Sequence, residues 1–450
     1  MDKGSIDTGV RYKNNNVYVA YKRGYLEDHD TAVDNIAIEM GSNPVPYNWN
    51  AASFEHDAKQ EVPDWNAQII YRTGDKALPK VPKLRFKQDG SFKIAQFADI
   101  HMATGPHSCH NAPSSMACTG DINTLEMMER MLDSEQPDLV VYTGDNVDGL
   151  TSNDAFSTIL KYSKPVIERG IPWTIIFGNH DEEGDLSREE MMSSAQDLPY
   201  SLSQRGPLGI SGTGNYFLNE MELQNEKARF TLYFLDSGAY SFNLEYPGWD
   251  WIKDDQVEWF RQTSHAITSQ YHRDSVPNAL AFFHIPIPEY ALEGSRIVGD
   301  KNEGVSAPSY NSGMFEAFFE SKDVRATTVG HDHINDYCLD HRGINLCYGG
   351  GLGYGSYGNA NVPRRSRIFE IRNHGDRVDT WKRLDNDEMT LVSQQTLFVG
   401  KKSSSTPSYP NGSNRNGQSG SKSRPNRLGD DFFERMRQGA QYVMGGIGGQ

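Results

Sequence analysis

Aspartate, asparagine and histidine side chains recur in five short clusters along the chain. Imidazole nitrogens combined with carboxylate and amide oxygens are the ligands that borderline transition metals prefer. The pattern therefore predicts a metal centre. The clusters are Asp99-Ile100-His101, Gly144-Asp145-Asn146, Gly178-Asn179-His180-Asp181, the single His284, and Gly330-His331-Asp332-His333.

The number of ligands suits two ions rather than one. Two ions held about 3.5–4 Å apart need a shared carboxylate. Asp145 is the best candidate for this bridge, because Gly144 before it lets the backbone approach closely. We expect one ion at Asp99, His101, Asp145 and His333, and the other at Asp145, Asn179, His284 and His331.

Each residue also has an ordinary structural explanation. A single histidine near the end of a strand is more often packed or exposed than a ligand, and Gly-Asp pairs are common in turns. Five such clusters in this order, each near an apolar run, are an improbable coincidence. His107, His110 and His341 lie outside the pattern, and we expect them to be loop residues.

The clusters lie near short apolar runs that read as buried strands separated by helices. This alternation predicts a layered α/β domain in which helices cover a sheet. Loops that leave the carboxyl ends of parallel strands meet at one edge, where ligands bind. The expected strands are 93–98, 138–143, 173–177, 230–235, 279–283 and 326–329, with helices at 122–134 and 256–271 and an antiparallel pair at 367–371 and 378–383.

Composition divides the chain into three zones. Residues 1–83 read as a β-rich unit that packs on the catalytic domain, and residues 84–390 contain all five clusters. Residues 391–450 read as a low-complexity, disordered tail, because Ser, Asn, Gly and Pro dominate it from residue 401. Residues 401–450 hold eight Lys or Arg and three Asp or Glu, a net charge of +5, which suits an acidic partner.

The charge balance and the cysteines bear on partners and compartment. The formal charge of −16 disfavours nucleic-acid binding. No apolar run approaches the ~18–20 residues of a membrane span. Residues 1–25 lack the apolar core of a secretory signal, which predicts a cytoplasmic location.

Disulfides in the pairs Cys109/Cys118 and Cys338/Cys347 would instead indicate a secretory or vacuolar protein. A turn at 340–343 would place Cys338 opposite Cys347.

The order and identity of the clusters resemble the calcineurin-like metallophosphoesterase superfamily. The resemblance covers about residues 84–390. The segments 143–146, 338–358 and 380–385 resemble its purple-acid-phosphatase-like branch, which includes plant proteins labelled inactive purple acid phosphatases and fungal dosage-dependent cell-cycle regulator phosphatases. The resemblance implies a layered β-sandwich flanked by helices. It also implies hydrolysis of phosphoric esters by in-line attack of a hydroxide that bridges two metal ions.

One departure from the purple enzymes concerns the metals. Those enzymes carry Asp-x-Gly in the first motif and Gly-Asp-x-x-Tyr in the second, where the tyrosine binds ferric iron and gives the colour. The corresponding positions here are His101 and Asp148. We therefore expect a colourless protein whose two ions are iron, zinc or manganese.

A phosphatase also needs an acid to protonate the leaving group. His180 is our candidate, with Asp181 orienting its imidazole. The alternative is that His180 only hydrogen-bonds a neighbouring loop. The expected substrate is a phosphomonoester, either a small molecule or a phosphoprotein. The alternatives are a phosphodiester or nucleotide pyrophosphate, or a non-catalytic interaction protein with a structural metal site.

Overall fold

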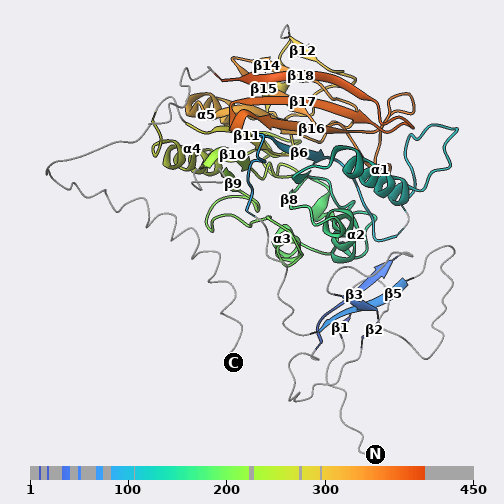
Figure 1. Cartoon of the computed structure of the whole chain (residues 1–450). Coiled ribbons are helices and arrows are strands. Elements are labelled where there is room, and N and C mark those ends of the chain that lie inside the picture. Colours follow the sequence, from blue (N-terminus) through green and yellow to red (C-terminus); the bar gives the residue numbers. More distant parts are fainter. Residues whose placement is uncertain are drawn as a thin grey trace, which may run out of the picture.

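The computed structural model (Figure 1) describes residues 10–11, 18–19, 33–40, 49–51, 67–73, 83–105, 107–221, 228–272, 276–293 and 296–400. The basic segment 401–450 and most of the N-terminal unit lie outside these residues. The expected partner of the tail therefore stays a prediction.

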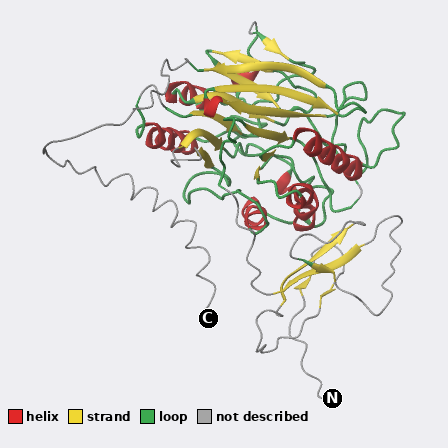
Figure 2. Ribbon diagram, viewed as in Figure 1, coloured by secondary structure: helices red, strands yellow, loops and turns green. Residues whose placement is uncertain are grey.

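Two β-sheets form the centre of the molecule, and helices flank them (Figure 2). The six-stranded sheet has the order β18-β17-β16-β6-β7-β8, and the seven-stranded sheet has the order β12-β14-β15-β13-β11-β10-β9. The first sheet contains β6 (Phe92–Phe97), β7 (Leu139–Thr143), β8 (Trp173–Ile176), β16 (Arg365–Arg372), β17 (Arg377–Leu384) and β18 (Leu391–Val399). The second contains β9 (Tyr216–Met221), β10 (Ala228–Phe234), β11 (Asn278–Phe282), β12 (Ile297–Val298), β13 (Val324–Val329), β14 (Cys338–His341) and β15 (Ile344–Tyr348).

The strands that precede the clusters run parallel within each sheet. In one sheet β6, β7 and β8 are parallel neighbours, and in the other β10, β11, β13 and β15 are. All six expected strands are present within about two residues of the expected bounds, and β16 pairs antiparallel with β17 as predicted. The expectation of a single sheet edge is wrong, because β11 and β13 belong to the second sheet.

The sheets pack face to face, and each carries helices on its outer side. Side chains of β6, β7, β10 and β11 share one buried cluster between the sheets, where the rings of Phe282 and Phe369 are 6.3 Å apart. A second cluster lies under α1 (Gly120–Glu135), α2 (Ala155–Glu168) and α3 (Arg188–Gln196), and a third under α4 (Asp254–Thr268) and α5 (Met314–Ser321). The β-sandwich flanked by helices is confirmed.

The strand β18 corrects the expected start of the tail. It covers residues 391–399, pairs antiparallel with β17 and packs Leu397 and Phe398 against the core between the sheets. Several of its residues are polar because it is an edge strand whose side chains are half-buried or exposed. Edge strands tolerate polar residues such as its Ser, Gln and Thr, so this segment lacks the continuous apolar run of the central strands. The expectation of disorder from residue 391 is therefore wrong for residues 391–399.

The described part of the N-terminal unit is built from short strands, in agreement with the β-rich expectation. Trp49 and Ile70 are buried in the cluster that α1–α3 cover, and the Trp49 ring lies 5.8 Å from that of Phe156 on α2. These contacts agree with packing on the catalytic domain. The strands are β1 (Val10–Arg11), β2 (Tyr18–Val19), β3 (Val33–Met40), β4 (Asn50–Ala51) and β5 (Ala67–Thr73).

Candidate metal centre

Every predicted ligand lies just beyond the carboxyl end of a strand. Three loops come from the six-stranded sheet and two from the seven-stranded sheet, so the centre lies where the ends of both sheets meet. Asp99 and His101 follow β6, Asp145 follows β7, Asn179 follows β8, His284 follows β11, and His331 and His333 follow β13.

The backbone at four of these residues is in the left-handed region. The φ angles are 53° at Asp99, 42° at His101, 50° at Asp145 and 75° at His331. Residues other than glycine rarely adopt this conformation, and those that do cluster at functional sites. Hydrogen bonds between loops hold it: the amide of Asp99 donates to the carbonyl oxygen of Gly144 (3.2 Å), and the amide of His101 donates to that of Asp145 (2.9 Å).

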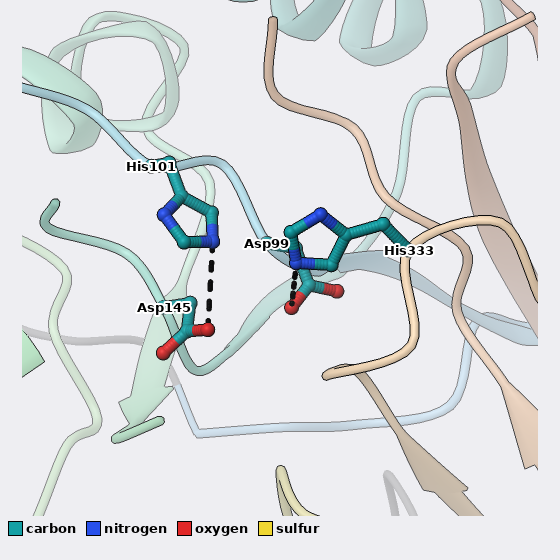
Figure 3. A group of neighbouring side chains, drawn as sticks. All are labelled: Asp99, His101, Asp145 and His333. Atoms are coloured by element: carbon teal, nitrogen blue, oxygen red, sulfur yellow. Dashed lines mark ion pairs between the residues drawn. The ribbon is translucent and has the colours of Figure 1, made fainter. Parts of the chain in front are cut away.

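The first expected ligand group is brought together by the fold (Figure 3). One ligand atom from each of Asp99, His101, Asp145 and His333 lies within 4.8 Å of the others, and all four side chains are buried. His101 Nε2 is 3.4 Å from Asp145 Oδ2, and His333 Nε2 is 3.5 Å from Asp99 Oδ1.

The second expected group shares Asp145 with the first. Ligand atoms of Asp145, His284 and His331 lie within 4.8 Å of one another, and His284 Nε2 is 3.2 Å from Asp145 Oδ2. The amide of Asn179 donates from Nδ2 to the hydroxyl oxygen of Tyr240 (3.4 Å), whereas its Oδ1 is buried and has no hydrogen-bond partner.

Two of the imidazoles are held in the tautomer that suits metal binding. Nδ1 of His284 lies 2.9 Å from the carbonyl oxygen of Thr143, and Nδ1 of His333 lies 2.9 Å from that of Tyr357. A carbonyl oxygen only accepts, so Nδ1 carries a hydrogen in both rings and Nε2 is the nitrogen left for a metal ion. Metal-bound histidines are commonly oriented in this way.

Five of the oxygen and nitrogen atoms that could bind metal here have no hydrogen-bond partner among the described residues. Buried polar atoms without a hydrogen bond are rare in folded proteins. His284 Nε2 lies 3.2 Å from Asp145 Oδ2, and against the effect of burial this carboxylate raises the pKa of His284 to about 9, so the contact favours a positive charge that either a proton or a metal ion can supply. The residues therefore fit metal ions. The buried atoms without a partner are Asp99 Oδ2, His101 Nε2, Asn179 Oδ1, His284 Nε2 and His331 Nε2.

Burial opposes protonation of His284, but the carboxylates of Asp145 and Asp99 raise its pKa to about 9, whereas the pKa shifts at Asp99 and His331 are set by burial. Burial raises the pKa of Asp99 to about 7, with the nearby Asp145 carboxylate adding to the shift. It lowers the pKa of His331 to about 3, and the neighbouring His284 ring adds to that effect. Low pKa values keep imidazole nitrogens available as ligands, whereas a buried carboxylate is costly unless a cation is close.

Glycines make room for the ligands. A Cβ atom at Gly178 would lie 2.2 Å from Asp145 Oδ1, and one at Gly144 would lie 2.5 Å from His284 Nδ1. At Gly330 it would lie 2.8 Å from Asp99 Oδ2. Any side chain at these positions would push a ligand out of place, which explains why the polar clusters contain glycine.

His180 lies beside the centre, and its partner is not the expected one. Its Nδ1 is 2.6 Å from Glu183 Oε2, its side chain is 32 % exposed, and its ring lies 5.2 Å from that of His101. Burial opposes protonation, but the carboxylates of Asp145 and Glu183 raise the pKa of His180 above its ordinary value. Glu183 was missed because the sequence offers several acidic residues after His180 and does not show which one turns toward its ring.

Asp181 has a different role from the one expected. Its carboxylate is buried and accepts four backbone hydrogen bonds, so it fixes the loops that carry the ligands and does not orient His180. This expectation is therefore wrong. The donors are the amides of Asp145 (2.9 Å), Asn146 (2.9 Å), Val147 (2.9 Å) and Gly178 (2.7 Å).

Aromatic side chains that the sequence analysis did not assign pack on the ligands. The Tyr357 ring stacks on His333 with 3.9 Å between centroids, and the Trp249 ring meets His331 edge-on at 4.3 Å. Asp148, at the position of the purple enzymes' tyrosine, lies 3.2 Å from His107 through Oδ2 and Nε2. Among the described residues, His107, His110 and His341 belong to neither ligand group.

Both cysteine pairs are disulfide-bonded. Cys109 is joined to Cys118, and Cys338 is joined to Cys347, which faces it across the β14–β15 hairpin as the turn predicted. Within the described part of the chain, we find no helix that combines the length and apolar character needed to cross a bilayer.

Comparison with known proteins agrees with this arrangement. Residues 92–335 match the family described as calcineurin-like phosphoesterase. The chain is 41 % identical over 343 residues to "Probable inactive purple acid phosphatase 29" of Arabidopsis thaliana, covering 70 % of this chain and 88 % of that protein. It is 38 % identical to "Phosphatase DCR2" of Saccharomyces cerevisiae, covering 71 % of this chain and 58 % of that protein.

A solved structure is also similar. The purple acid phosphatase PPD1 from yellow lupin (Lupinus luteus) aligns over 80 % of this chain and 69 % of that one, with a TM-score of 0.42 and 13 % identity. The family match and the sequence relatives show that this chain belongs to the calcineurin-like phosphoesterase family, in the branch of proteins named purple acid phosphatases.

Proposed function

We propose that the protein is a phosphatase that depends on two metal ions and hydrolyses phosphomonoesters. Two such ions, when bound, supply Lewis acidity toward a water molecule and toward the phosphoryl oxygens. The residues that would hold them are Asp99, His101, Asp145 and His333 for one ion, and Asp145, Asn179, His284 and His331 for the other.

The observation that carries this proposal is that two ligand groups share one carboxylate. Asp145 Oδ2 lies within 3.4 Å of His101 Nε2 in the first group and 3.2 Å from His284 Nε2 in the second. A carboxylate between two sets of imidazoles is what a pair of closely spaced cations requires. A single structural ion would leave one of the two groups without a function.

Relatives named "inactive" raise the alternative of a non-catalytic protein. The site argues for activity, because each of the seven predicted ligand residues belongs to a ligand group or offers a buried acceptor without a partner. Loss of activity by decay of the site would ordinarily remove at least one such ligand. The name of the yeast relative, a phosphatase, agrees with the proposed chemistry.

We propose that His180 protonates the leaving group. Its Nδ1 faces the Glu183 carboxylate at 2.6 Å, which directs Nε2 away from that partner, and one-third of the side chain is open to solvent. The amide of His180 donates to Asp145 Oδ1 at 2.8 Å, so the backbone of the acid is fixed to the shared carboxylate. Glu183 acts through His180 as a positioning residue.

The test combines metal analysis with two model substrates. We expect purified protein to bind about two equivalents of iron, zinc or manganese, and to hydrolyse p-nitrophenyl phosphate faster than bis(p-nitrophenyl) phosphate. Asp145→Asn should lose both metal and activity, while the exposed Asp89→Asn should keep both. Faster hydrolysis of the bis-ester would make the protein a phosphodiesterase. Full metal loading without hydrolysis of either ester would favour an interaction protein.

The disulfides bear on the compartment. Structural disulfides form and persist in oxidising compartments. Two of them in one chain favour the secretory or vacuolar alternative over the cytoplasmic expectation. Secretion of a tagged full-length protein, with free thiols counted by alkylation under denaturing conditions, would decide between the two.

A further inference from the structure

A glycine-rich loop lies beside the first ligand group. Residues 349–358 follow β15 in the connection to β16, and six of these ten residues are glycine. We call this segment the glycine loop. It contains none of the predicted ligands, but it lies against three of the four residues of the first ligand group, which Figure 3 shows.

Two amides and a carbonyl oxygen of the glycine loop hold the first ligand group. The amide of Gly353 donates to the carbonyl oxygen of Asp99 (3.0 Å), and the amide of Gly351 donates to that of His333 (2.8 Å). The carbonyl oxygen of Tyr357 accepts from Nδ1 of His333 at 2.9 Å. The loop therefore sets both the backbone position and the ring orientation of His333.

Close packing explains why the loop needs glycine. A Cβ atom at Gly353 would lie 2.1 Å from the carbonyl oxygen of Ile100, and one at Gly355 would lie 2.4 Å from that of His101. Neither glycine has a φ angle in the left-handed region, so the requirement is for space rather than for an unusual backbone conformation. The glycine loop thus lies directly against the segment 99–101, which carries two ligands.

Arg364 fastens the glycine loop to its surroundings. Its side chain is buried, and its guanidinium donates to the carbonyl oxygens of Tyr357 (2.7 Å), Ser356 (2.8 Å) and His110 (2.8 Å). The Tyr357 oxygen is the same one that orients His333. Because His110 belongs to a different loop, Arg364 joins two loops and fixes the oxygen that holds the ligand.

The chemistry of Arg364 suits positioning better than simple filling of space. Burial disfavours the charged guanidinium and lowers the pKa of Arg364 to about 10, while the three hydrogen bonds end on neutral carbonyl oxygens. Buried ionic groups can often be replaced by apolar side chains without loss of stability. Stability alone therefore does not require an arginine here, whereas its planar fork can hold several carbonyl oxygens at fixed positions.

The second ligand group depends on other elements. Nδ1 of His284 bonds to the carbonyl oxygen of Thr143, which ends β7. The glycine loop approaches this group through the Tyr357 hydroxyl, which lies 3.4 Å from the carbonyl oxygen of His331. That contact is longer than an ordinary O–H···O hydrogen bond. The loop therefore supports the first group more strongly than the second.

We propose that the glycine loop, held by Arg364, positions the ligands of the first metal ion, and that the second ion binds independently of this loop. Arg364 is then a positioning residue that acts through the backbone of Tyr357. The inference rests on the two-ion centre of the proposed function. The alternative is that the loop and Arg364 only stabilise the fold.

The experiment measures metal binding rather than turnover. The full-length chain is freed of metal with a chelator and titrated with Co²⁺, whose visible absorption yields a dissociation constant for each ion. The test variants are Arg364→Lys, which keeps the charge without the planar fork, and Gly355→Ala. Their matched controls are Arg325→Lys, at the amino end of β13 where Arg325 donates to Asn278 Oδ1, and Gly304→Ala, whose Cβ would meet no atom within 4 Å.

Two variants that each lack one ligand identify the ions. His333→Ala removes a ligand of the first group, and His284→Ala removes one of the second. We expect Arg364→Lys and Gly355→Ala to raise one of the two dissociation constants about 10–100-fold, as loss of a group that orients a metal ligand does. The spectrum of the ion that remains should match that of His333→Ala. Both control variants should keep both wild-type constants.

The inference is overturned if both test variants keep both wild-type constants, or if the spectrum that remains matches that of His284→Ala. Equal weakening of both ions would also overturn it, because the loop would then only stabilise the fold. Urea unfolding of the metal-free proteins shows whether each variant is folded, and the two test variants change different parts of the loop.

Hydrolysis of p-nitrophenyl phosphate by the wild type separates this inference from the phosphatase proposal. If the wild type binds two ions without hydrolysis, the phosphatase proposal fails and the dissociation constants still decide the inference. If the wild type hydrolyses the ester and the test variants keep both constants, the inference fails alone. A wild type that binds at most one ion would overturn both.

Discussion

Replacement of Asp181 by asparagine tests whether this residue builds the centre or takes part in the chemistry. The carboxylate is buried, and each of its oxygens accepts two backbone amides: Oδ1 from Asn146 and Val147, and Oδ2 from Asp145 and Gly178. An asparagine side chain keeps one acceptor oxygen and offers an NH2 group in place of the other. Two backbone N–H groups would then face the NH2 group of the asparagine, which cannot accept a hydrogen bond from them.

The size of the effect follows from these two lost acceptors. A buried donor left without a partner costs about 1–3 kcal/mol, so Asp181→Asn should lower the free energy of unfolding by about 2–6 kcal/mol. In either orientation of the asparagine, at least one of the two affected amides lies in the loop after β7, which carries Asp145. Displacement of that loop should also lower the metal content.

The assay compares urea unfolding and metal content of three proteins. The matched control is Asp185→Asn in the same loop. Asp185 is exposed and accepts one amide, that of Ala155 (2.8 Å), through one oxygen, which asparagine reproduces by rotation. We expect it to differ from the wild type by about 0.5 kcal/mol at most, as for ordinary surface changes.

The opposite result would refute this reasoning. If Asp181→Asn kept the wild-type unfolding midpoint and metal content but lost turnover, Asp181 would act on the chemistry, as the sequence had suggested. An equally large loss of stability in Asp185→Asn would show that any Asp-to-Asn change in this loop is destabilising. The effect could then not be assigned to the four hydrogen bonds that Asp181 accepts.

Four further results are expected. Glu183→Gln should lower kcat about tenfold or more, as loss of an oriented general acid does, while metal content measured by mass spectrometry stays unchanged. Gly178→Ala should reduce metal content because the added Cβ meets a ligand carboxylate, whereas Gly304→Ala, whose Cβ would meet no atom within 4 Å, should not. The iron-loaded protein should lack the visible band of purple enzymes, because Asp148 stands where they have tyrosine. Burial opposes ionisation of Glu135, but hydrogen bonds from Trp381, Arg383 and Lys93 lower its pKa. Its stabilising contribution is therefore complete above the unfolded-state pKa near 4.5 and is lost as the pH falls through the lower folded-state pKa. The stability difference between the wild type and Glu135→Gln should therefore shrink as the pH falls below about 4.5.

The central strands were predictable because a strand that is buried on both faces consists mostly of consecutive apolar residues. Segments such as Leu139–Thr143 and Trp173–Ile176 are fully buried and read as short apolar runs. Their assignment to two sheets was not predictable from composition, because a parallel strand buried on both faces looks the same in either sheet. The edge strand β18 has no such apolar run, because its side chains are half-buried or exposed and polar residues are tolerated there.

The ligands and their supports differ in predictability for a chemical reason. A metal ligand must be one of a few residue types, so Asp145 and His284 stand out beside their strands. A residue that orients a ligand needs only a suitable atom at the right place. Thr143 and Tyr357 hold imidazoles through their backbone carbonyl oxygens, which every residue has. Such contacts depend on the fold alone, and this is also why Glu183 could not be distinguished from its acidic neighbours.

The loss of the purple enzymes' tyrosine need not mean the loss of catalysis. Asp148, in its place, faces His107 and belongs to neither ligand group. His101 contributes Nε2 to the first group instead, so that group still offers four ligand residues, including the shared Asp145. Exchange of a phenolate for a neutral imidazole changes the charge and softness of the donor, and so the metal that is preferred and its colour. The chemistry that a pair of cations supplies depends on their spacing and on an open coordination position, neither of which this exchange removes.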